Sequence, residues 1–393
     1  MVRRRRGRAG IYSAIGVILV VVVVAAVGAS TNWYGLQKSS SPPTLQGNGA
    51  QIANPLLSVW TSSYNKQTGN SVNYVDGGSG TGITDFSEHP PLIDFAIADE
   101  PLSPAAQSAL PAQPLILPIV GGALTIIYNL TGLTGHLHLT GAVLAGIYNG
   151  TITTWNNAAV VALNPGVNLP SSTIVPVVRS DPAGTTYVLT DFLSQSSPWW
   201  ASTVGKGISV DFPKVAAETA VKGNSLVIST VAKTSDSIGY SDLTDVLSYS
   251  GSGALNYSAI QNPAGDYIVP TIADTASAIA DKVASLATIP ESTDLKDWFN
   301  VSMVNAKGTS DYPLATFIYL YVYQATDKGF APTMTKSQLI VQWLDYILSP
   351  AAQAMVSETT PSQLYYTALP AAIISVDQAG ISTMTFNGAP ITA

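Results

Sequence analysis

The chain has 393 residues, of which 46% are hydrophobic and only 10% are charged. The apolar fraction excludes a disordered chain, and the absence of cysteine, together with only three histidines, excludes disulfides and thiol catalysis and leaves no evident ligands for a catalytic metal, so no cofactor is expected. Five of the 17 Lys and Arg residues lie in the first eight positions; the remainder carries 12 positive against 24 negative charges, which argues against binding of nucleic acid.

The N-terminal segment has the pattern of a membrane anchor. Residues 1–8 form a basic tail that is expected to stay in the cytoplasm, and residues 9–29 form a charge-free, mostly apolar run that is long enough to span a bilayer. A cleaved signal peptide is the alternative. A linker at 30–44, rich in Ser and Pro at its end, follows. We therefore expect a body outside the cytoplasm, on a single-pass anchor or secreted.

Strand and helix patterns alternate through the rest of the chain. Alternating or continuous apolar residues predict strands at 71–75, 93–98, 115–120, 123–128, 173–178 and 317–323. Gly121-Gly122 predicts a break between the third and fourth of these strands. Apolar residues at helical spacing predict helices at 52–64, 185–193 and 336–348. The alternation indicates an α/β protein with largely parallel sheets.

Small residues collect at three junctions where a helix is expected to begin. These junctions are 47–51, 77–82 and 179–186. A helix N-terminus presents unpaired backbone N–H groups and a partial positive charge, and Gly lets an anion approach the backbone. Any one of these loops could equally be a plain turn. Together they predict anion binding, whereas the signatures of nucleotide-binding loops and of a nucleophile elbow are missing from the sequence.

The motifs along the body, taken in order, resemble those of phosphate-binding proteins of the phosphate ABC importer. The resemblance covers essentially everything from residue 45 onward. It is carried by Gly47-Asn48-Gly49-Ala50, Thr68-Gly69-Asn70, Gly78-Ser79-Gly80, Asp94 through Leu102, Ile147-Tyr148-Asn149-Gly150, Leu163-Asn164-Pro165-Gly166, Val178-Arg179 through Gly184-Thr185, Gly223-Asn224, Ile238-Gly239-Tyr240 and Tyr366 through Pro370.

The resemblance implies a two-lobed periplasmic-binding-protein-like fold of type II, in which two hinge crossings join the lobes. The first crossing is expected near 120–123 and the second near 313–317. Lobe one would then comprise 45–121 plus 315–393, and lobe two would comprise 122–314. An anion would lie between the lobes, which close around it by a hinge motion.

The same resemblance implies the binding residues. The binding Ser of the family falls on Ser79, its carboxylate on Asp99, its Arg on Arg179 and its Gly-Thr pair on Gly184 and Thr185. Three positions depart from the pattern of well-known members. A Thr-Phe pair is replaced by Gln51 and Ile52, and a Ser is replaced by Ala183, so two hydroxyl donors are lost while backbone donors remain possible.

The implied function is a receptor that binds inorganic phosphate outside the cytoplasm and delivers it to the permease subunits of an ABC importer. It is expected to be a tethered monomer and not an enzyme. Asp99 is the expected selectivity element, because an ionised carboxylate accepts a hydrogen bond from protonated phosphate and repels sulfate. The alternatives are a receptor for sulfate or molybdate, a phosphate sensor without an importer, and an extracellular phosphohydrolase.

Overall fold

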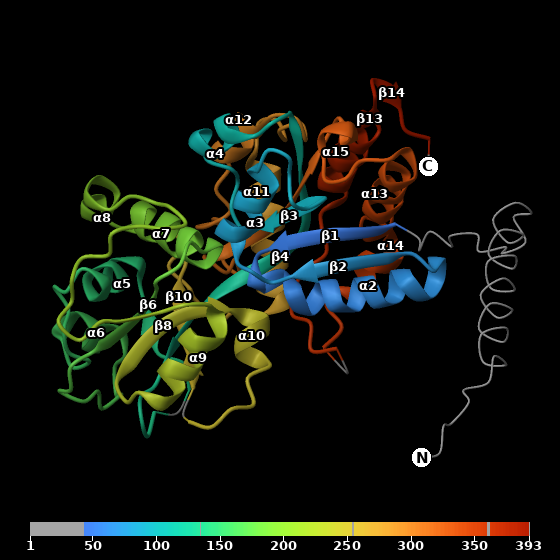
Figure 1. Ribbon diagram of the computed structural model, residues 1–393. Helices are drawn as coiled ribbons and strands as arrows, with labels where there is room; N and C mark the ends of the chain where they lie inside the picture. Colours follow the sequence, from blue (N-terminus) through green and yellow to red (C-terminus); the bar gives the residue numbers. More distant parts are fainter. Residues whose placement is uncertain (1–42, 134, 254, 360–361, 393) are drawn as a thin grey trace, which may run out of the picture. The chain divides into compact units, whose positions relative to one another are not determined.

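Two long strands, β4 (Pro114–Tyr128) and β12 (Ala315–Tyr323), pair antiparallel at the centre of the fold (Figure 1). The computed structural model describes residues 43–392 except 134, 254, 360 and 361. Within this part, the main sheet has the strand order β2-β1-β3-β12-β4-β8-β6-β7. Strand β4 therefore belongs to both halves of the sheet, and it carries the backbone from one lobe to the other.

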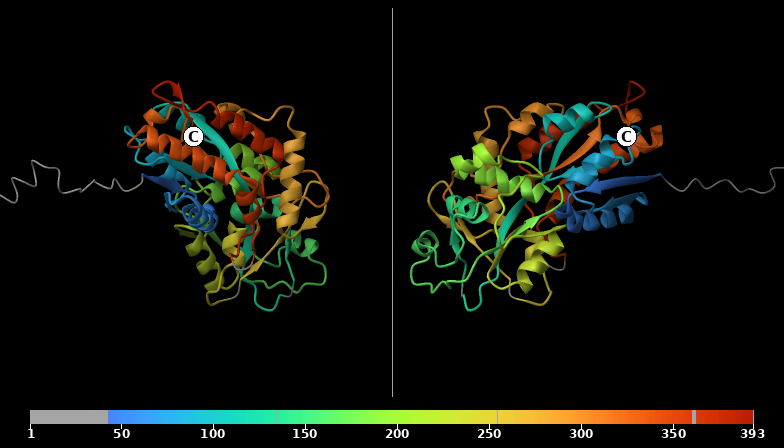
Figure 2. Two further views of the ribbon diagram at one scale, coloured as in Figure 1. Left: turned by 90° about the vertical axis from the view of Figure 1, so that its right-hand side faces the viewer. Right: turned by 60° about the vertical axis from the view of Figure 1, so that its left-hand side comes forward.

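The first lobe is built on three parallel strands. They are β1 (Thr44–Gly49), β2 (Ser71–Val75) and β3 (Phe95–Ala98), and the last of them pairs antiparallel with β12. Helices α2 (Asn54–Thr68) and α3 (Ser79–Ser87) follow β1 and β2. The C-terminal helix α13 (Met334–Ile347) returns to this lobe and packs against β1 and α2 (Figure 2).

The second lobe repeats this plan with different residues. Its strands β6 (Val175–Arg179), β7 (Thr219–Val221) and β8 (Ser237–Asp242) are parallel, and β8 pairs antiparallel with the second half of β4. Strands β6 and β7 lead to the helices that matter for the site. These helices are α7 (Gly184–Ser196) and α9 (Asn224–Lys233), and α10 (Leu243–Leu247) follows β8.

The other elements surround the two lobes or lie on their edges. They are η1 (Gln51–Ala53), α4 (Pro104–Ala109), β5 (His138–Leu139), α5 (Gly141–Tyr148), α6 (Ala158–Leu163), α8 (Pro198–Thr203), β9 (Asn256–Tyr257), β10 (Ala259–Gln261), β11 (Tyr267–Ile268), α11 (Ile272–Ser285), α12 (Leu295–Asn300), η2 (Thr326–Lys328), α14 (Pro350–Met355), α15 (Ala371–Ile381), β13 (Thr385–Phe386) and β14 (Ala389–Pro390).

Gly121 and Gly122 do not interrupt the strand, so the predicted break was wrong. β4 runs unbroken through them, and the backbone of Gly121 exchanges two hydrogen bonds of 2.9 Å with Thr367. A Cβ on Gly121 would lie 2.2 Å from the side chain of Ile279. The two glycines therefore permit close packing where β4 passes between the lobes.

The expectation of largely parallel sheets was also only partly right. Each lobe has a parallel group of strands, but β12 and β4 are antiparallel to their neighbours because both connect the lobes. A second difference concerns the division of the chain. Residues of α11 and α12, such as Ala278, Ile279 and Trp298, pack in the hydrophobic core around β1, β3 and β12, although the sequence-based division counted them in lobe two.

The predicted basic tail (1–8) and transmembrane segment (9–29) lie outside the described residues, as does nearly all of the predicted linker. Strand β1 begins at Thr44, the last residue assigned to that linker. In the part of the chain that the structure describes, no helix combines the length and the apolar character needed to cross a membrane.

Candidate functional site

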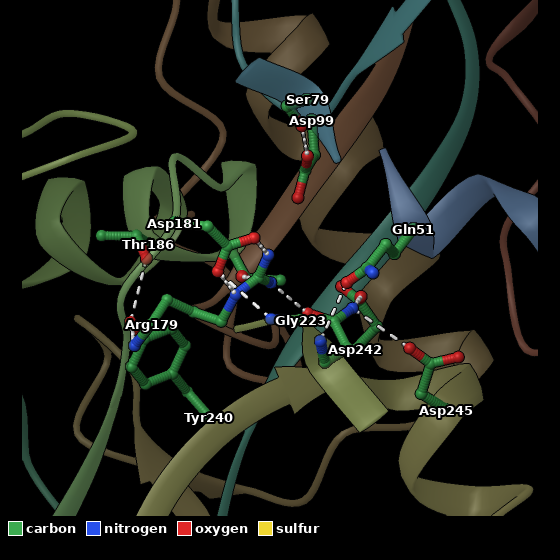
Figure 3. A network of polar contacts seen from close by, with 12 residues as sticks. Gln51, Ser79, Asp99, Arg179, Asp181, Thr186, Gly223, Tyr240, Asp242 and Asp245 are labelled. Atoms are coloured by element: carbon green, nitrogen blue, oxygen red, sulfur yellow. Dashed lines mark hydrogen bonds and ion pairs between the residues drawn. The ribbon is translucent and has the colours of Figure 1, made fainter. Parts of the chain in front are cut away.

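A small cleft between the two lobes gathers all the site residues that the sequence predicted. Its walls come from the start of η1, the N-termini of α3 and α7, the end of β6 and the segment after β3 (Figure 3). The predicted residues that line it are Gln51, Ile52, Ser79, Asp99, Arg179, Ala183, Gly184 and Thr185; Gly78, Asn224 and Asp242 also line it.

Arg179 is the cation of the cleft, and it is held by residues of its own lobe. Its Nε and Nη2 donate to the two carboxylate oxygens of Asp181, at 2.7 and 2.6 Å. Its Nη1 donates to Thr185 Oγ1 at 3.3 Å and to Asn224 Oδ1 at 2.5 Å. A guanidinium has five N–H donors. Within the described residues four are engaged, so one remains for a guest, and the other four set the orientation of the plane.

The pairing with Asp181 keeps this cation charged in spite of its burial. Burial by itself lowers the pKa of Arg179, but the hydrogen bonds and charge of Asp181 outweigh it and leave the pKa raised. For Asp181 the opposite holds: burial favours the neutral acid, yet Arg179 outweighs it and lowers the pKa. The bidentate geometry matches a planar fork to a carboxylate, which makes the pair strong as well as directional.

Lobe one contributes a carboxyl and a hydroxyl. Ser79 Oγ, at the start of α3, donates to Asp99 Oδ1 at 2.7 Å, and both side chains are almost completely buried. Asp99 faces the other lobe closely, because a Cβ on Gly184 would lie 1.7 Å from its Oδ1. Glycine at the first position of α7 is therefore required when the two lobes meet in this arrangement.

Two adjacent buried carboxyls follow β3, and their surroundings separate them. Burial raises the pKa of Asp99, while the hydrogen bond from Ser79 and the charge of Arg179 oppose the rise. Burial and then the charge of Asp99 raise the pKa of Glu100 well above its usual value. Because neighbouring carboxyls cannot both ionise cheaply in a buried site, Glu100 is the group that stays protonated and Asp99 is the acceptor.

The helices that begin at the cleft lack the usual N-terminal caps. The residues before η1, α3, α7 and α9 are Ala50, Gly78, Ala183 and Gly223, and none of them offers a side-chain oxygen to the first turn. In the described part of the chain, eight helices elsewhere do have such a cap: α4, α5, α6, α8, α11, α12, α13 and α14. The cleft thus keeps free N–H groups that a guest can accept from.

Gln51 reaches across the cleft. Its Oε1 accepts a hydrogen bond from the backbone N–H of Asn224, the first residue of α9, at 2.8 Å. The sequence analysis expected the amide of Gln51 to offer a donor to the anion, whereas in the structure the carbonyl end of this amide joins the lobes. Ile52 and Ala183, the other departures, line the cleft with their backbone and apolar side chains.

Sequence reasoning missed a cluster of polar side chains below Arg179. Asn224 accepts from Arg179 and donates through Nδ2 to Asp242 Oδ2 and, at 3.1 Å, to Asp245 Oδ2 (Figure 3). Gly223-Asn224 was part of the family resemblance but received no role. Asp181, two residues after Arg179, was within reach of a local argument. Asp242 and Asp245 were not, because they approach only through the folding of β8 and α10.

The chemistry of the cleft is that of a receptor for a small oxyanion. One paired guanidinium, hydroxyls and uncapped helix N-termini supply donors, while Asp99 supplies an acceptor that suits a guest carrying a proton. Within the described residues, no group of three or more His, Asp or Glu side chains is arranged to hold a metal ion.

Comparisons with known proteins agree with this geometry. A model of the PBP superfamily domain matches residues 36–351. The chain is 35% identical over 299 residues to the phosphate-binding protein PstS of Xylella fastidiosa (strain 9a5c), covering 73% of this chain and 76% of the relative. It is 33% identical over 337 residues to the phosphate-binding protein PstS of Pasteurella multocida, covering 86% and 89%.

Solved structures share the fold. A high-affinity periplasmic phosphate-binding protein (PfluDING) bound with phosphate superposes with a TM-score of 0.65 at 20% identity, covering 86% of this chain and 93% of that one. The phosphate-binding protein of Stenotrophomonas maltophilia superposes with a TM-score of 0.62 at 18% identity, with the same coverage. At such identities the likeness concerns the two-lobed α/β fold alone.

Proposed function

The chain belongs to the PstS family of phosphate-binding proteins, within the PBP superfamily, and on that premise we propose that it is the receptor that binds inorganic phosphate and delivers it to an ABC importer. It works by binding and release and not by catalysis. In this proposal the anion lies between Ser79 and Asp99 of lobe one and Arg179, Gly184 and Thr185 of lobe two.

The observation that carries the proposal is the convergence of one oriented guanidinium, several uncapped helix N-termini and one buried carboxyl on a single cleft. The guanidinium and N–H groups accept any oxyanion. Asp99, the remaining acceptor, selects a guest that can donate a hydrogen bond. At neutral pH phosphate keeps a proton, whereas sulfate has none and would face the carboxylate oxygen to oxygen.

The energies permit this function without further cations. Hydrogen bonds to a charged group contribute roughly 1.5–3 kcal/mol each, so about eight of them contribute ~12–24 kcal/mol. Association costs on the order of 4–15 kcal/mol. Micromolar binding requires only about 8 kcal/mol. The lost hydroxyls at positions 51 and 183 reduce the count, and backbone donors at Gln51, Ile52 and Ala183 are proposed to make up part of it.

The arrangement of the chain is proposed as follows. Residues 9–29 anchor the protein in the membrane, or are cleaved as a signal, and the body lies outside the cytoplasm as a monomer. Lobe one comprises 45–121 and 315–393 together with the α11–α12 segment that packs on its core, and lobe two comprises the rest of 122–314. Phosphate shifts a hinge equilibrium toward the closed arrangement.

Calorimetric titration of the full-length chain with phosphate and with sulfate tests the function. We expect saturable phosphate binding with one site per chain and, at neutral pH, far weaker sulfate binding. Preference for sulfate or molybdate would contradict the proposal in favour of another oxyanion receptor. Release of phosphate from a chromogenic phosphate ester would contradict it in favour of an enzyme.

A further inference from the structure

A second cavity lies between the lobes, one helical turn beyond the anion cleft. It has a volume of about 230 Å³. Ile83 lies one turn after Ser79 on α3, and Tyr187 lies one turn after Gly184 on α7. The segment after β3 and Phe299 of α12 form the wall on the side of the first core, and residues 206–209 close the other side.

The size and lining of this cavity suit a small organic molecule. The apolar part of the wall comes from Ile83, Leu102, Ile208 and Phe299. A dry apolar cavity of about 150 Å³ already accommodates benzene. The present cavity is larger than that, so it has room for one aromatic ring together with a polar group.

Two buried polar groups line the cavity and are left without a partner in the part of the chain that the structure describes. They are Oε2 of Glu100 and Oη of Tyr187, on side chains of residues that are 5% and 7% exposed. Buried polar groups are rarely left unpaired, because the lost hydrogen bond costs about 1–3 kcal/mol. Each orphaned group therefore indicates a missing partner in the cavity.

Lys206 provides a positive charge at the same place. Its Nζ lies 5.2 Å from the centroid of the Tyr187 ring and 5.9 Å from that of Phe299, and its ion pair with Asp191 Oδ1 is 3.3 Å long. The side chain of Lys206 is 29% exposed, which leaves the ammonium accessible. An ammonium and a phenol hydroxyl both donate hydrogen bonds, so the complementary group is an anionic acceptor.

From this geometry we propose that the cavity binds a small monocarboxylate with an apolar ring, whose carboxylate faces Lys206 and Tyr187 and whose ring packs against Ile83, Leu102 and Phe299. Burial raises the pKa of Glu100 well above its usual value, which makes this side chain a third donor.

The cavity shares walls with the anion cleft, which couples the two sites. Glu100 directly follows Asp99, and the carbonyl of Ile208 accepts a hydrogen bond of 2.8 Å from the N–H of Ala183, the residue before α7. Since both lobes contribute walls, a guest that fills the cavity favours the closed arrangement. Phosphate and the carboxylate must then strengthen each other's binding by the same factor.

Titration of the full-length chain with benzoate tests the proposal, with benzyl alcohol and formate as probes that lack the charge or the ring. We expect saturable benzoate binding and weaker binding of the two partial probes. Lys206→Met should weaken benzoate binding by about tenfold or more. Ala106→Leu, which adds volume to the cavity wall, should weaken it as well. The matched control Lys233→Met, at the exposed end of α9, should change it less than about twofold.

Saturating benzoate should raise phosphate affinity by about fivefold or more, and phosphate should raise benzoate affinity equally. Benzoate binding that is absent, or that is indifferent to both Lys206→Met and Ala106→Leu, would overturn the proposal. Benzoate binding without any effect on phosphate affinity would overturn the coupling. Because benzoate binding is measured without phosphate, a chain that failed to bind phosphate would not obscure this result.

Discussion

The two walls of the cleft hold their charges in opposite ways. In lobe two, Arg179 is paired with Asp181 and fixed by Asn224 before any guest arrives, so its charge is stabilised and its direction is set. In lobe one, Asp99 has one hydroxyl partner, Ser79, and its burial raises its pKa. The comparison shows a division of labour. A pre-organised cation attracts oxyanions in general, and a carboxylate kept short of partners accepts only a guest that supplies a hydrogen.

The largest expected effect comes from removing the acceptor of lobe one. Asp99→Asn replaces a carboxylate by an amide of equal shape that can donate to sulfate. A site built to pair a substrate hydroxyl can reject an analogue without it by about 10⁴–10⁵, so the ratio of phosphate to sulfate affinity should fall by several orders of magnitude. Competition titrations at neutral pH measure the ratio. An unchanged ratio would remove Asp99 from selectivity.

Breaking the pair of lobe two should have the next largest effect. Arg179→Met removes the cation and leaves Asp181 buried without its partner, which costs about 3–5 kcal/mol. We expect phosphate affinity to fall by at least a hundredfold and the unfolding midpoint to fall as well. The double variant Arg179→Met with Asp181→Asn should recover stability without recovering binding. If it recovered both, Arg179 would be a structural residue only.

Closure of the two walls depends on a missing side chain. In Gly184→Ala the added Cβ would overlap Asp99 Oδ1, so lobe closure should cost about 1–3 kcal/mol, which corresponds to roughly 10–100-fold weaker phosphate binding. The stability of the ligand-free chain in urea should change little. Gly329→Ala, remote from the cleft, is the matched control. Unaltered phosphate affinity in Gly184→Ala would show that the walls do not meet as described.

The carboxyls below Arg179 give the cleft a pH dependence of defined sign. Burial raises the pKa of Asp245 from 3.8 to about 6, although the hydrogen bond from Asn224 and the charge of Arg179 oppose the rise. A raised pKa contributes stability at low pH that is lost as pH rises through about 6. The ligand-free chain should therefore lose about 1–3 kcal/mol of unfolding free energy between pH 4.5 and pH 7.5 from this group.

Urea titrations of the wild-type chain and Asp245→Asn at these two pH values test this, since the variant should show a smaller loss. The remaining loss comes from Asp99 and Asp242, whose pKa values burial also raises. Asp266→Asn, at an exposed position, should leave the loss unchanged. A larger pH dependence in Asp245→Asn than in the wild type would reverse the assigned sign.

The smallest expected effect concerns the contact between the walls. Gln51→Ala removes the acceptor of the Asn224 N–H, a hydrogen bond of about 0.5–1.5 kcal/mol, so phosphate should dissociate roughly two- to tenfold faster. Stopped-flow measurement of release provides the rate, and Gln67→Ala on the exposed side of α2 is the control. Slower release, or none of this difference, would mean that Gln51 does not hold the lobes together.

Local signals were sufficient for much of the architecture. Apolar periodicity located the helices now seen as α2, α7 and α13 and the strands seen as β2, β3 and β12 to within a few residues. The strand break at Gly121-Gly122 was a wrong prediction for a physical reason. Glycine signals a turn when only neighbours in sequence are considered, but here it answers to Ile279 and Thr367, which approach from distant parts of the chain.

The sequence by itself determined the α/β class, the three Gly-rich junctions and the set of eight residues that line the cleft, because turn chemistry, periodicity and family motifs are written in contiguous residues. Only the tertiary structure decided which groups these residues meet. The bond from Asn224 to Gln51 joins residues 173 positions apart, and the pairing of Arg179 with Asn224 spans 45. Such contacts depend on how β4 and β12 bring the lobes together, and that long-range packing leaves no periodic trace in the chain.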